Sequence, residues 1–504
     1  MKVLLYSCSS RRYPYPGTLL EEAKTLADAG NQVVFAYCSG VMNACSCNVY
    51  STPIRCKVCQ FGYGRILKPY PGIRYYPLKR ENVKDRTFEY DDLASLKRIV
   101  YRDVEIGYAV LSELISFSRN PEPDVSGAAK PGIDHLLNES ANLVDRAITL
   151  IDEIKPDMVA FYNGRFSDTR PVMDVAKARG IPFRCNEVVS SSAENEKFRR
   201  FVYENNLPHN YPYNTELIRK LWALDNEPLE EKRKKGAMFF ERRRRGESTG
   251  DLLVPDHKQG YIDSQIRGKL PADWDPAKRN MAIFNSSEDE YVALGRDFEQ
   301  YSLFRSQLDA IRYLLANTKD DTVHYYLRVH PNMRNIQHPY HLDLYKLESE
   351  FKNITVLAAS SDYSTYDIME AAEKVIVFGS TMGAEAAYWN KPVIALSGSF
   401  YYFLDICYIP RSTDELDRLI TEKLEPKQNR DNVLMFGYYC MHKDELSPAW
   451  KYYPDGKTAL DHGLLQKIVA PFPHNRASFL RSLILKTIRL GRHTEITIKP
   501  FEEK

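Results

Sequence analysis

The stretch from Lys374 to Leu396 constrains the fold of this 504-residue chain more than any other. Its residues 375–378 are all apolar, and a short apolar run bounded by turn residues predicts a strand buried on both faces. A helical segment and a second apolar run, 393–396, come later in the stretch. Between the first run and the helix lie the small turn residues Gly379, Ser380, Thr381 and Gly383. Strand, turn, helix and strand in this order form half of a nucleotide-binding α/β domain.

The turn in this stretch leaves backbone N–H groups at the start of a helix. A phosphate is stabilised at such a position by hydrogen bonds and by the helix dipole. An ordinary loop in which Ser380 or Thr381 caps the helix explains the same residues. A glycine-rich turn is a weak signal by itself, so both interpretations stay open at this stage.

The composition, 43% hydrophobic and 27% charged, is that of an ordinary soluble protein. The length allows two or three domains, and the net charge of +2 gives no reason to expect a nucleic-acid partner. No apolar run approaches the roughly 20 residues of a membrane-spanning helix. The start, MKVLLYSCSSRR, predicts a first strand and not a signal peptide. We therefore expect a cytoplasmic protein, in which disulfides among the nine cysteines are not expected.

The N-terminal half alternates predicted strands and helices. Strands are predicted at 3–6, 33–37 and 157–162, and helices at 17–29, 91–117 and 133–154. The opening strand–helix–strand unit is typical of a Rossmann-like domain. We therefore expect the ends of its strands to face a ligand-binding cleft.

Polar residues follow two of the N-terminal strands. Asn163 and Arg165 follow the strand at 157–162, and Glu187 ends the next strand. Because parallel strands end at the same edge of a sheet, these three side chains are expected to converge, with Asn163 and Arg165 contacting substrate. A carboxylate there can act as a general base. A salt bridge between Arg165 and Glu187 is the structural alternative.

Five cysteines lie close together between residues 38 and 59. Cys56 and Cys59 have the spacing of a metal knuckle, and Cys38 with Cys45 would complete a four-thiolate zinc site. Cys47 would then be the spare or a substitute ligand. Reduced thiols in a loop rich in Tyr and Pro are the alternative, and we favour a structural zinc with no part in the chemistry.

Composition shifts suggest the domain boundaries. We expect an N-terminal acceptor-side domain at 1–226 with the cysteine-rich insertion, an interdomain connection at 227–278, a donor domain at 279–440 and a C-terminal helical segment at 441–504. The run Arg242–Arg245 is interpreted as a solvated face, with phosphate or membrane binding as the alternative. The basic, apolar segment 476–492 either packs back across both domains or lies on a membrane surface.

In the C-terminal half, polar side chains follow four predicted strands. They supply a cation, an imidazole, hydroxyls, an aromatic ring and one carboxylate, which suit a nucleotide leaving group. No Asp-x-Asp pair is placed to bind Mg²⁺, so the reaction is expected to need no metal. The candidate donor-binding residues are Ser286, Ser287, Arg328, His330, Asn332, Tyr366, Ser380, Thr381 and Glu385.

These motifs resemble the donor domain of GT-B glycosyltransferases. The matching stretches are RVHPN (328–332), YD (366–367) and GSTMGAEAAYWNKPV (379–393). The similarity is greatest to capsule-polysaccharide biosynthesis proteins, which include bacterial Kdo transferases. The His-Pro and Ser/Thr pairing is also similar to bacterial sialyltransferases, in which these residues hold the CMP phosphate. The resemblance is good over residues 281–406 and patchy over the N-terminal half.

The resemblance implies an α/β protein of GT-B fold, with two Rossmann-like domains facing across a cleft. It implies donor-binding roles for His330, Ser380, Thr381 and Glu385. FNSSEDE (284–290), FYNGR (161–165) and the cysteine group look like further marks of this set. The Asp/Glu-Asp-Gly base motif of the sialyltransferases is not found, so Glu187 is our candidate base.

The sequence thus predicts a transferase that moves a sugar from a nucleotide-activated donor to a surface polysaccharide or to a glycolipid acceptor, with peripheral contact at the inner membrane face. Glu187 would deprotonate the acceptor, while His330, Arg328 and the Ser380/Thr381 helix start stabilise the departing phosphate. A nucleotide-sugar epimerase of the same fold and a non-catalytic scaffold of a polysaccharide assembly complex are the alternatives. A dehydrogenase is disfavoured, because neither strand–helix–strand unit carries GxGxxG.

Overall fold

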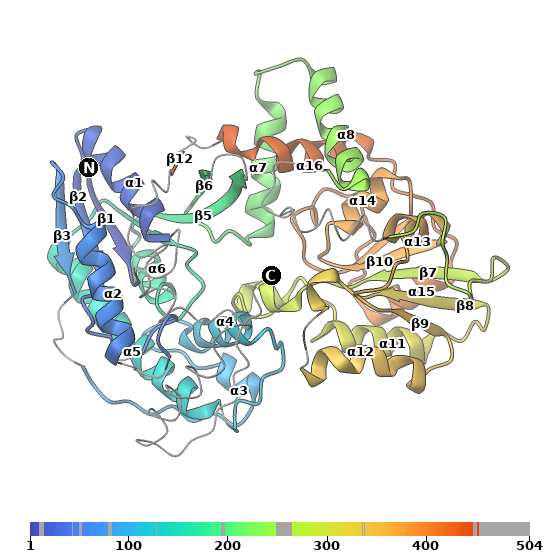
Figure 1. The fold of residues 1–504 in the computed structure, drawn as a ribbon, viewed down its shortest axis with the longest axis horizontal. Coiled ribbons are helices and arrows are strands. Elements are labelled where there is room, and N and C mark those ends of the chain that lie inside the picture. Colours follow the sequence, from blue (N-terminus) through green and yellow to red (C-terminus); the bar gives the residue numbers. More distant parts are fainter. Residues whose placement is uncertain are drawn as a thin grey trace.

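The computed structural model describes residues 1–9, 15–42, 44–49, 53–78, 83–127, 129–192, 197–247, 265–334, 336, 338–446 and 451–452. Figure 1 shows two α/β domains on opposite sides of the molecule, each built on its own sheet. The predicted α/β class is therefore confirmed.

The N-terminal sheet has the strand order β12-β6-β5-β4-β1-β2-β3. Strands β3, β2, β1, β4 and β5 are parallel, whereas β6 pairs antiparallel with β5 and β12 antiparallel with β6. The strands are β1 (Lys2–Ser7), β2 (Gln32–Tyr37), β3 (Ile73–Pro77), β4 (Met158–Tyr162), β5 (Phe183–Ser192), β6 (Lys197–Glu204) and β12 (Lys451–Tyr452). The parallel strands run in the order of a Rossmann domain, with its switch point between β1 and β4.

The helices up to the end of the sixth strand are α1 (Tyr15–Asp28), α2 (Pro53–Ile66), α3 (Leu93–Lys97), α4 (Ile106–Ser118), α5 (Lys130–Ile154) and α6 (Arg170–Ala178). They are followed by α7 (Tyr211–Ala223) and α8 (Leu229–Arg245), which lead away from this sheet. Leu19 and Ala23 of α1 are buried with Val3 and Leu5 of β1 on one face. The predicted helix at 91–117 is wrong as one element, because Arg102 and Asp103 take positive φ and separate α3 from α4.

The C-terminal sheet is entirely parallel, in the order β11-β10-β7-β8-β9. Its strands are β7 (Arg279–Phe284), β8 (Val323–Arg328), β9 (Ile354–Leu357), β10 (Lys374–Phe378) and β11 (Val393–Ser397). Every residue of β10 and β11 is buried, as the apolar runs predict. The strand order repeats that of the N-terminal parallel strands, and its switch point lies between β7 and β10.

The helices of this domain connect successive parallel strands, except the last of them, which follows β11. They are α10 (Arg296–Glu299), α11 (Gln307–Asn317), α12 (Pro339–Glu350), α13 (Thr365–Ala371), α14 (Met382–Tyr388) and α15 (Thr413–Thr421). Short 3₁₀ turns are η1 (Glu288–Glu290), η2 (Pro331–Met333) and η3 (Lys443–Leu446). Two Rossmann-like domains joined in this way form the GT-B architecture that the sequence predicts.

The chain returns from the second domain to the first through α16 (Arg430–His442), which packs on α7 and α8 (Figure 1). Glycines allow the helix backbones to touch: a Cβ added at Gly437 would lie 2.3 Å from Gly236 O. Of the predicted segment 441–504, the described residues form the end of α16, η3 and β12, and the stretch 476–492 lies outside them. Among the described residues, no helix combines the length and apolar character that crossing a membrane requires.

Candidate active site

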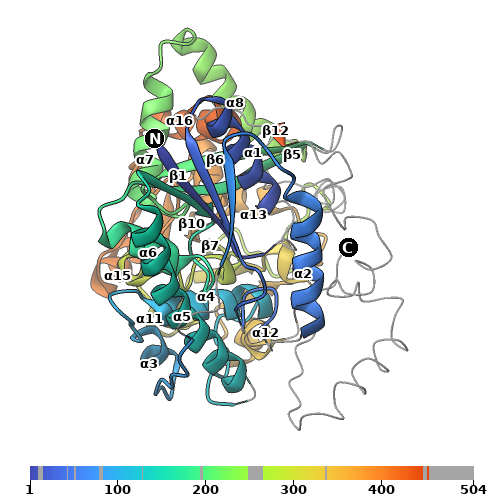
Figure 2. The same cartoon turned by 90° about the vertical axis from the view of Figure 1, so that its left-hand side faces the viewer.

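The loops after β4 and β7 meet on helix α4, so the carboxyl edges of the two sheets face each other. Ser116 of α4 accepts a hydrogen bond from Arg165 Nη2 at 3.0 Å and donates one to Asp289 O at 3.5 Å. Arg119, which caps the end of α4, donates from Nη2 to Ser287 Oγ at 2.8 Å. Figure 2 shows α4 near α12 of the other domain. Ser287 therefore contributes to the contact between the domains.

The loop between β10 and α14 is held in one conformation by its neighbours. Gly379 has φ +73°, and a Cβ at this position would lie 2.7 Å from Gly398 O, so the position requires glycine. Ser380 Oγ accepts a hydrogen bond from Met382 N at 3.3 Å, and the Tyr401 hydroxyl donates to Ser380 O. This local order keeps Ser380 and Thr381 at the start of α14.

Ser286 ties the loop after β7 to the end of β10 across the switch point. Its hydroxyl donates to Phe378 O at 2.5 Å, and its backbone N–H donates to Gln307 Oε1 at 3.0 Å. The Tyr291 hydroxyl lies 2.8 Å from Ser286 Oγ. The structure thus brings Ser286 beside the Ser380/Thr381 loop, as the rule for parallel strand ends predicts.

Glu385, Thr381 and Tyr366 form one bonded cluster around a residue from α8. Glu385 is 1% exposed, and its Oε1 accepts from Arg243 Nε at 2.9 Å. Arg243 Nη2 donates to Thr381 Oγ1 at 3.0 Å. The Tyr366 hydroxyl donates to Glu385 Oε2, and burial, followed by the Glu385 charge, raises the pKa of Tyr366 well above its usual value. The cluster joins a cation, a carboxylate and a phenol that stays protonated.

The polar residues at the end of β8 and directly after it lie in two different places. The backbone N–H of His330 donates to Asn285 Oδ1 at 2.8 Å, which places His330 beside the loop after β7, with its side chain partly exposed. Arg328 is 2% exposed. Its guanidinium donates hydrogen bonds to Ala358 O and to Ser361 Oγ, and its Nη2 donates to Ser361 O at 3.0 Å. Arg328 thus stabilises the loop after β9. Asn332 lies in η2, and its side chain is outside the described part.

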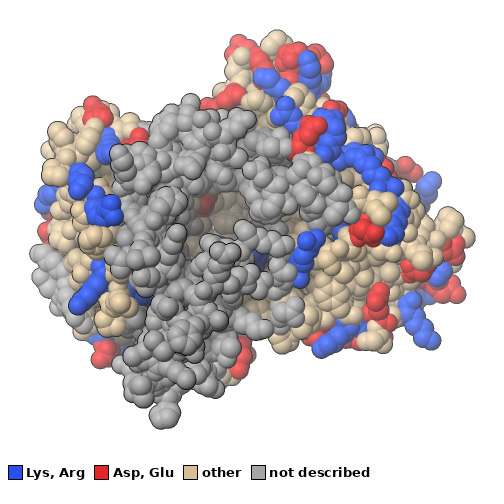
Figure 3. Space-filling model, viewed as in Figure 1, with Lys and Arg blue, Asp and Glu red and all other residues tan. Residues whose placement is uncertain are grey.

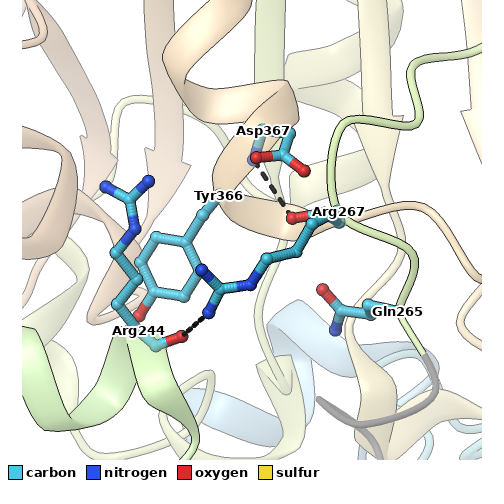
Figure 4. A pocket seen from close by; sticks show the side chains of 6 residues that line it. Arg244, Gln265, Arg267, Tyr366 and Asp367 are labelled. Atoms are coloured by element: carbon cyan, nitrogen blue, oxygen red, sulfur yellow. Dashed lines mark hydrogen bonds between the residues drawn. The ribbon is translucent and has the colours of Figure 1, made fainter.

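Tyr366 of this cluster also lines a pocket (Figure 4). Arg244 lies 4.5 Å from the centre of the Trp389 ring system and 5.8 Å from the centre of the Tyr366 ring, and Arg267 Nη2 donates to Arg244 O at 3.3 Å. The pocket is lined by Arg244, Gln265, Arg267, Ser364, Tyr366 and Asp367. Figure 3 shows basic side chains gathered on this part of the surface. Two guanidinium groups and an aromatic ring suit an anionic ligand with an aromatic part.

In the N-terminal domain, Glu187 and Asn163 are in direct contact. Glu187 Oε1 accepts from the Tyr162 hydroxyl at 2.5 Å, and Oε2 accepts from Asn163 Nδ2 at 2.8 Å. Asn163 and Gly164 both have positive φ, so the chain turns sharply where β4 ends. Arg165 extends to Ser116 and packs over the Phe166 ring at 4.8 Å. The predicted convergence is present for Asn163 and Glu187.

The cysteines of the predicted zinc site form no disulfide, and Cys56 and Cys59 lie on α2. Asn48 Nδ2 lies 3.2 Å from Cys56 Sγ. Burial raises the pKa of the Cys38 and Cys45 thiols. Within the described residues, no three His, Cys, Asp or Glu side chains are grouped to hold a metal. The arrangement does not fit a preformed metal site, and zinc stays a prediction.

The sequence did not single out Arg243, which lies in a basic run for which phosphate or membrane binding is only the alternative interpretation. The run Arg242–Arg245 was interpreted as a solvated face, but Phe239 and Phe240 precede Arg243 by four and three positions and share its helix face. Both phenylalanines are fully buried. The sequence also did not single out Tyr162, because no spacing rule distinguishes this side chain from its neighbours.

No family model matches the chain, and no curated protein matches it. Among solved structures, it is similar to KpsC of Thermosulfurimonas dismutans, a β-Kdo 2,4-transferase, with 16% identity and a TM-score of 0.34 over 55% of this chain and 78% of that one. It is also similar to UDP-GlcNAc 2-epimerase of Neisseria meningitidis, with 11% identity and a TM-score of 0.27, and the match covers 88% of this chain and 98% of that one. A third similar structure is that of the Streptomyces glycosyltransferase SsfS6, with 11% identity and a TM-score of 0.22, and the match covers 88% of this chain and 99% of that one. Similarities with such low TM-scores carry no argument about the reaction or the ligands of this protein.

Proposed function

We propose that this protein is a glycosyltransferase that moves a sugar from a nucleotide-activated donor to a glycan or lipid-linked acceptor of the cell surface. The observation that carries the proposal is the convergence of Ser286, Ser380, Thr381, Tyr366 and Glu385 at the switch-point edge of the C-terminal sheet. In open α/β sheets, ligands bind outside the carboxyl ends of the strands at this point.

In the proposal, the donor nucleotide binds to the C-terminal domain. Its phosphate lies against the loop 379–383, and the base extends toward Tyr366 and the adjoining pocket (Figure 4). The backbone N–H of His330 bonds to Asn285 of the β7 loop, and its imidazole is proposed to donate a hydrogen bond to the phosphate. The neighbouring strand ends thus offer donors to one charged group.

The acceptor is proposed to bind to the N-terminal domain, with Glu187 as the general base. Tyr162 and Asn163 each donate to one oxygen of Glu187, which fixes the carboxylate in one orientation. Such positioning is what proton abstraction from an acceptor hydroxyl needs. Because the loops after β4 and β7 meet at Ser116, donor and acceptor sites lie across the same domain boundary.

A nucleotide-sugar epimerase is the second candidate, because it requires the same nucleotide site. It differs in needing no acceptor, and its product is an isomer of the nucleotide sugar. A scaffold without turnover is the third. The site at the switch point is expected in all three, so only product analysis separates them.

A thermal-shift screen against CMP, UDP, GDP and their sugars tests the nucleotide site. A nucleotide at 100 times its Kd is expected to stabilise the protein by about 2.7 kcal/mol. The nucleotide sugar identified in this way is then incubated with and without candidate acceptors. Nucleotide release that depends on acceptor supports a transferase, and isomerisation without acceptor supports an epimerase. Absence of binding to any nucleotide contradicts the proposal.

A further inference from the structure

Helix α8 belongs to the connection between the domains, yet its C-terminal turns pack into the C-terminal domain. Phe240 stacks on Tyr388 of α14, with ring centroids 4.5 Å apart and planes at 13°. Phe239 contacts Phe436 of α16 edge-on at 6.1 Å. Both phenylalanines are fully buried, so the end of α8 is fixed against α14.

Arg243 is the residue that this packing directs toward the loop 379–383. Its side chain is 14% exposed and bonds to Glu385 and to Thr381. A buried guanidinium loses much of its hydration, which is costly unless it is paired. Its position beside Thr381 differs from that of Arg328, whose guanidinium holds the loop 358–361.

We infer that Arg243 is the cation that contacts the phosphate of the donor, and that Glu385 is a positioning residue for Arg243. The inference rests on the proposed function and names a residue of that site. Both oxygens of Glu385 accept hydrogen bonds, one from Arg243 and one from Tyr366. Glu385, which is 1% exposed and bonded through both oxygens, therefore fixes the orientation of the guanidinium plane.

The chemical role follows from where charge develops. As the sugar is transferred, the bond between its anomeric carbon and the phosphate oxygen breaks, and the electron pair stays on that oxygen. A bond forms from the acceptor oxygen to the anomeric carbon, and the acceptor proton passes to the base. A fixed guanidinium beside the phosphate stabilises the added charge without having to reorganise.

The test compares Arg243→Ala and Arg243→Lys with Arg245→Ala, a control on the same helix whose Arg245 forms an exposed ion pair with Glu247. Calorimetry measures binding of the nucleotide found in the screen and of the matching nucleoside, which has no phosphate. We expect Arg243→Ala to weaken nucleotide binding by roughly 10- to 100-fold and to leave nucleoside binding unchanged. The nucleotide affinity of Arg243→Lys is expected to lie between those of the parent protein and of Arg243→Ala. The nucleotide affinity of Arg245→Ala is expected to match that of the parent protein.

The outcomes separate this inference from the proposed function. If the parent protein binds a nucleotide and Arg243→Ala binds it equally well, the inference is wrong and the proposed function stands. Equal losses for nucleotide and nucleoside would mean that Arg243 only supports the fold, which also overturns it. If the parent protein binds no nucleotide, both proposals fail. Arg243→Lys keeps the charge and covers the case in which Arg243→Ala does not fold.

Discussion

Glu288 is a buried carboxylate whose ionisation should make the stability of the protein depend on pH. It is 4% exposed in the turn η1, accepts from Gln307 N at 3.0 Å, and accepts from the Tyr340 hydroxyl. Burial raises its pKa from 4.5 to about 7. The folded protein therefore binds a proton at this site in a range where the unfolded chain has released it.

The direction of the effect follows from this difference. Between pH 4.5 and 7 the folded state holds more protons at Glu288 than the unfolded state, so the free energy of unfolding falls as the pH rises. A shift of about 2.5 units corresponds to about 3 kcal/mol at 1.36 kcal/mol per unit, most of which is lost between pH 5 and 8. Glu288→Gln is neutral throughout and removes this dependence.

The assay is urea unfolding of the parent protein and of Glu288→Gln at steps from pH 5 to pH 8. At each pH we take the difference in unfolding free energy between Glu288→Gln and the parent protein, in which the effects of the other titrating groups cancel. From pH 5 to pH 8 this difference is expected to change by about 2 to 3 kcal/mol in favour of Glu288→Gln. Glu425→Gln, at a carboxylate that is 75% exposed, serves as the control and should give a flat difference. A flat difference for Glu288→Gln as well would refute the reasoning.

Two further substitutions separate structural roles from functional ones. Arg328→Met should lower the unfolding free energy by about 3 to 5 kcal/mol, because the carbonyls of Ala358 and Ser361 lose a buried charged donor, while nucleotide affinity stays the same. Lost affinity with unchanged thermal stability would instead make Arg328 a donor ligand. Glu187→Gln should lower turnover at least about 100-fold and leave nucleotide affinity unchanged. Turnover equal to that of the parent protein would exclude Glu187 as the base.

The parts of the fold that follow local rules were predictable from the sequence. The apolar runs at 375–378 and 393–396 could be assigned as buried strands because both sheet faces are covered by helices, and they are β10 and β11. The meeting of Ser286 with the Ser380/Thr381 loop followed from the common direction of parallel strands.

Features that depend on tertiary packing were not predictable in this way. Arg243 reaches the site from a helix and not from a strand end, so no rule about sheet edges includes it. Arg328 ends β8 as expected, but its side chain extends to the loop after β9, and alternation along a strand does not specify that partner. The break between α3 and α4 depends on positive φ at Arg102 and Asp103. Because neither residue is glycine, the sequence gives no sign of this backbone conformation.

The pairing of β12 with β6 has a consequence for biosynthesis. β6 ends at Glu204, and its pairing partner begins at Lys451, so nearly 250 residues must leave the ribosome before that edge is covered. An uncovered strand edge invites pairing with other chains. A chain ending at residue 446 should therefore aggregate more readily than the full-length protein during translation, and equal solubility of the two would show that this edge is protected by other means.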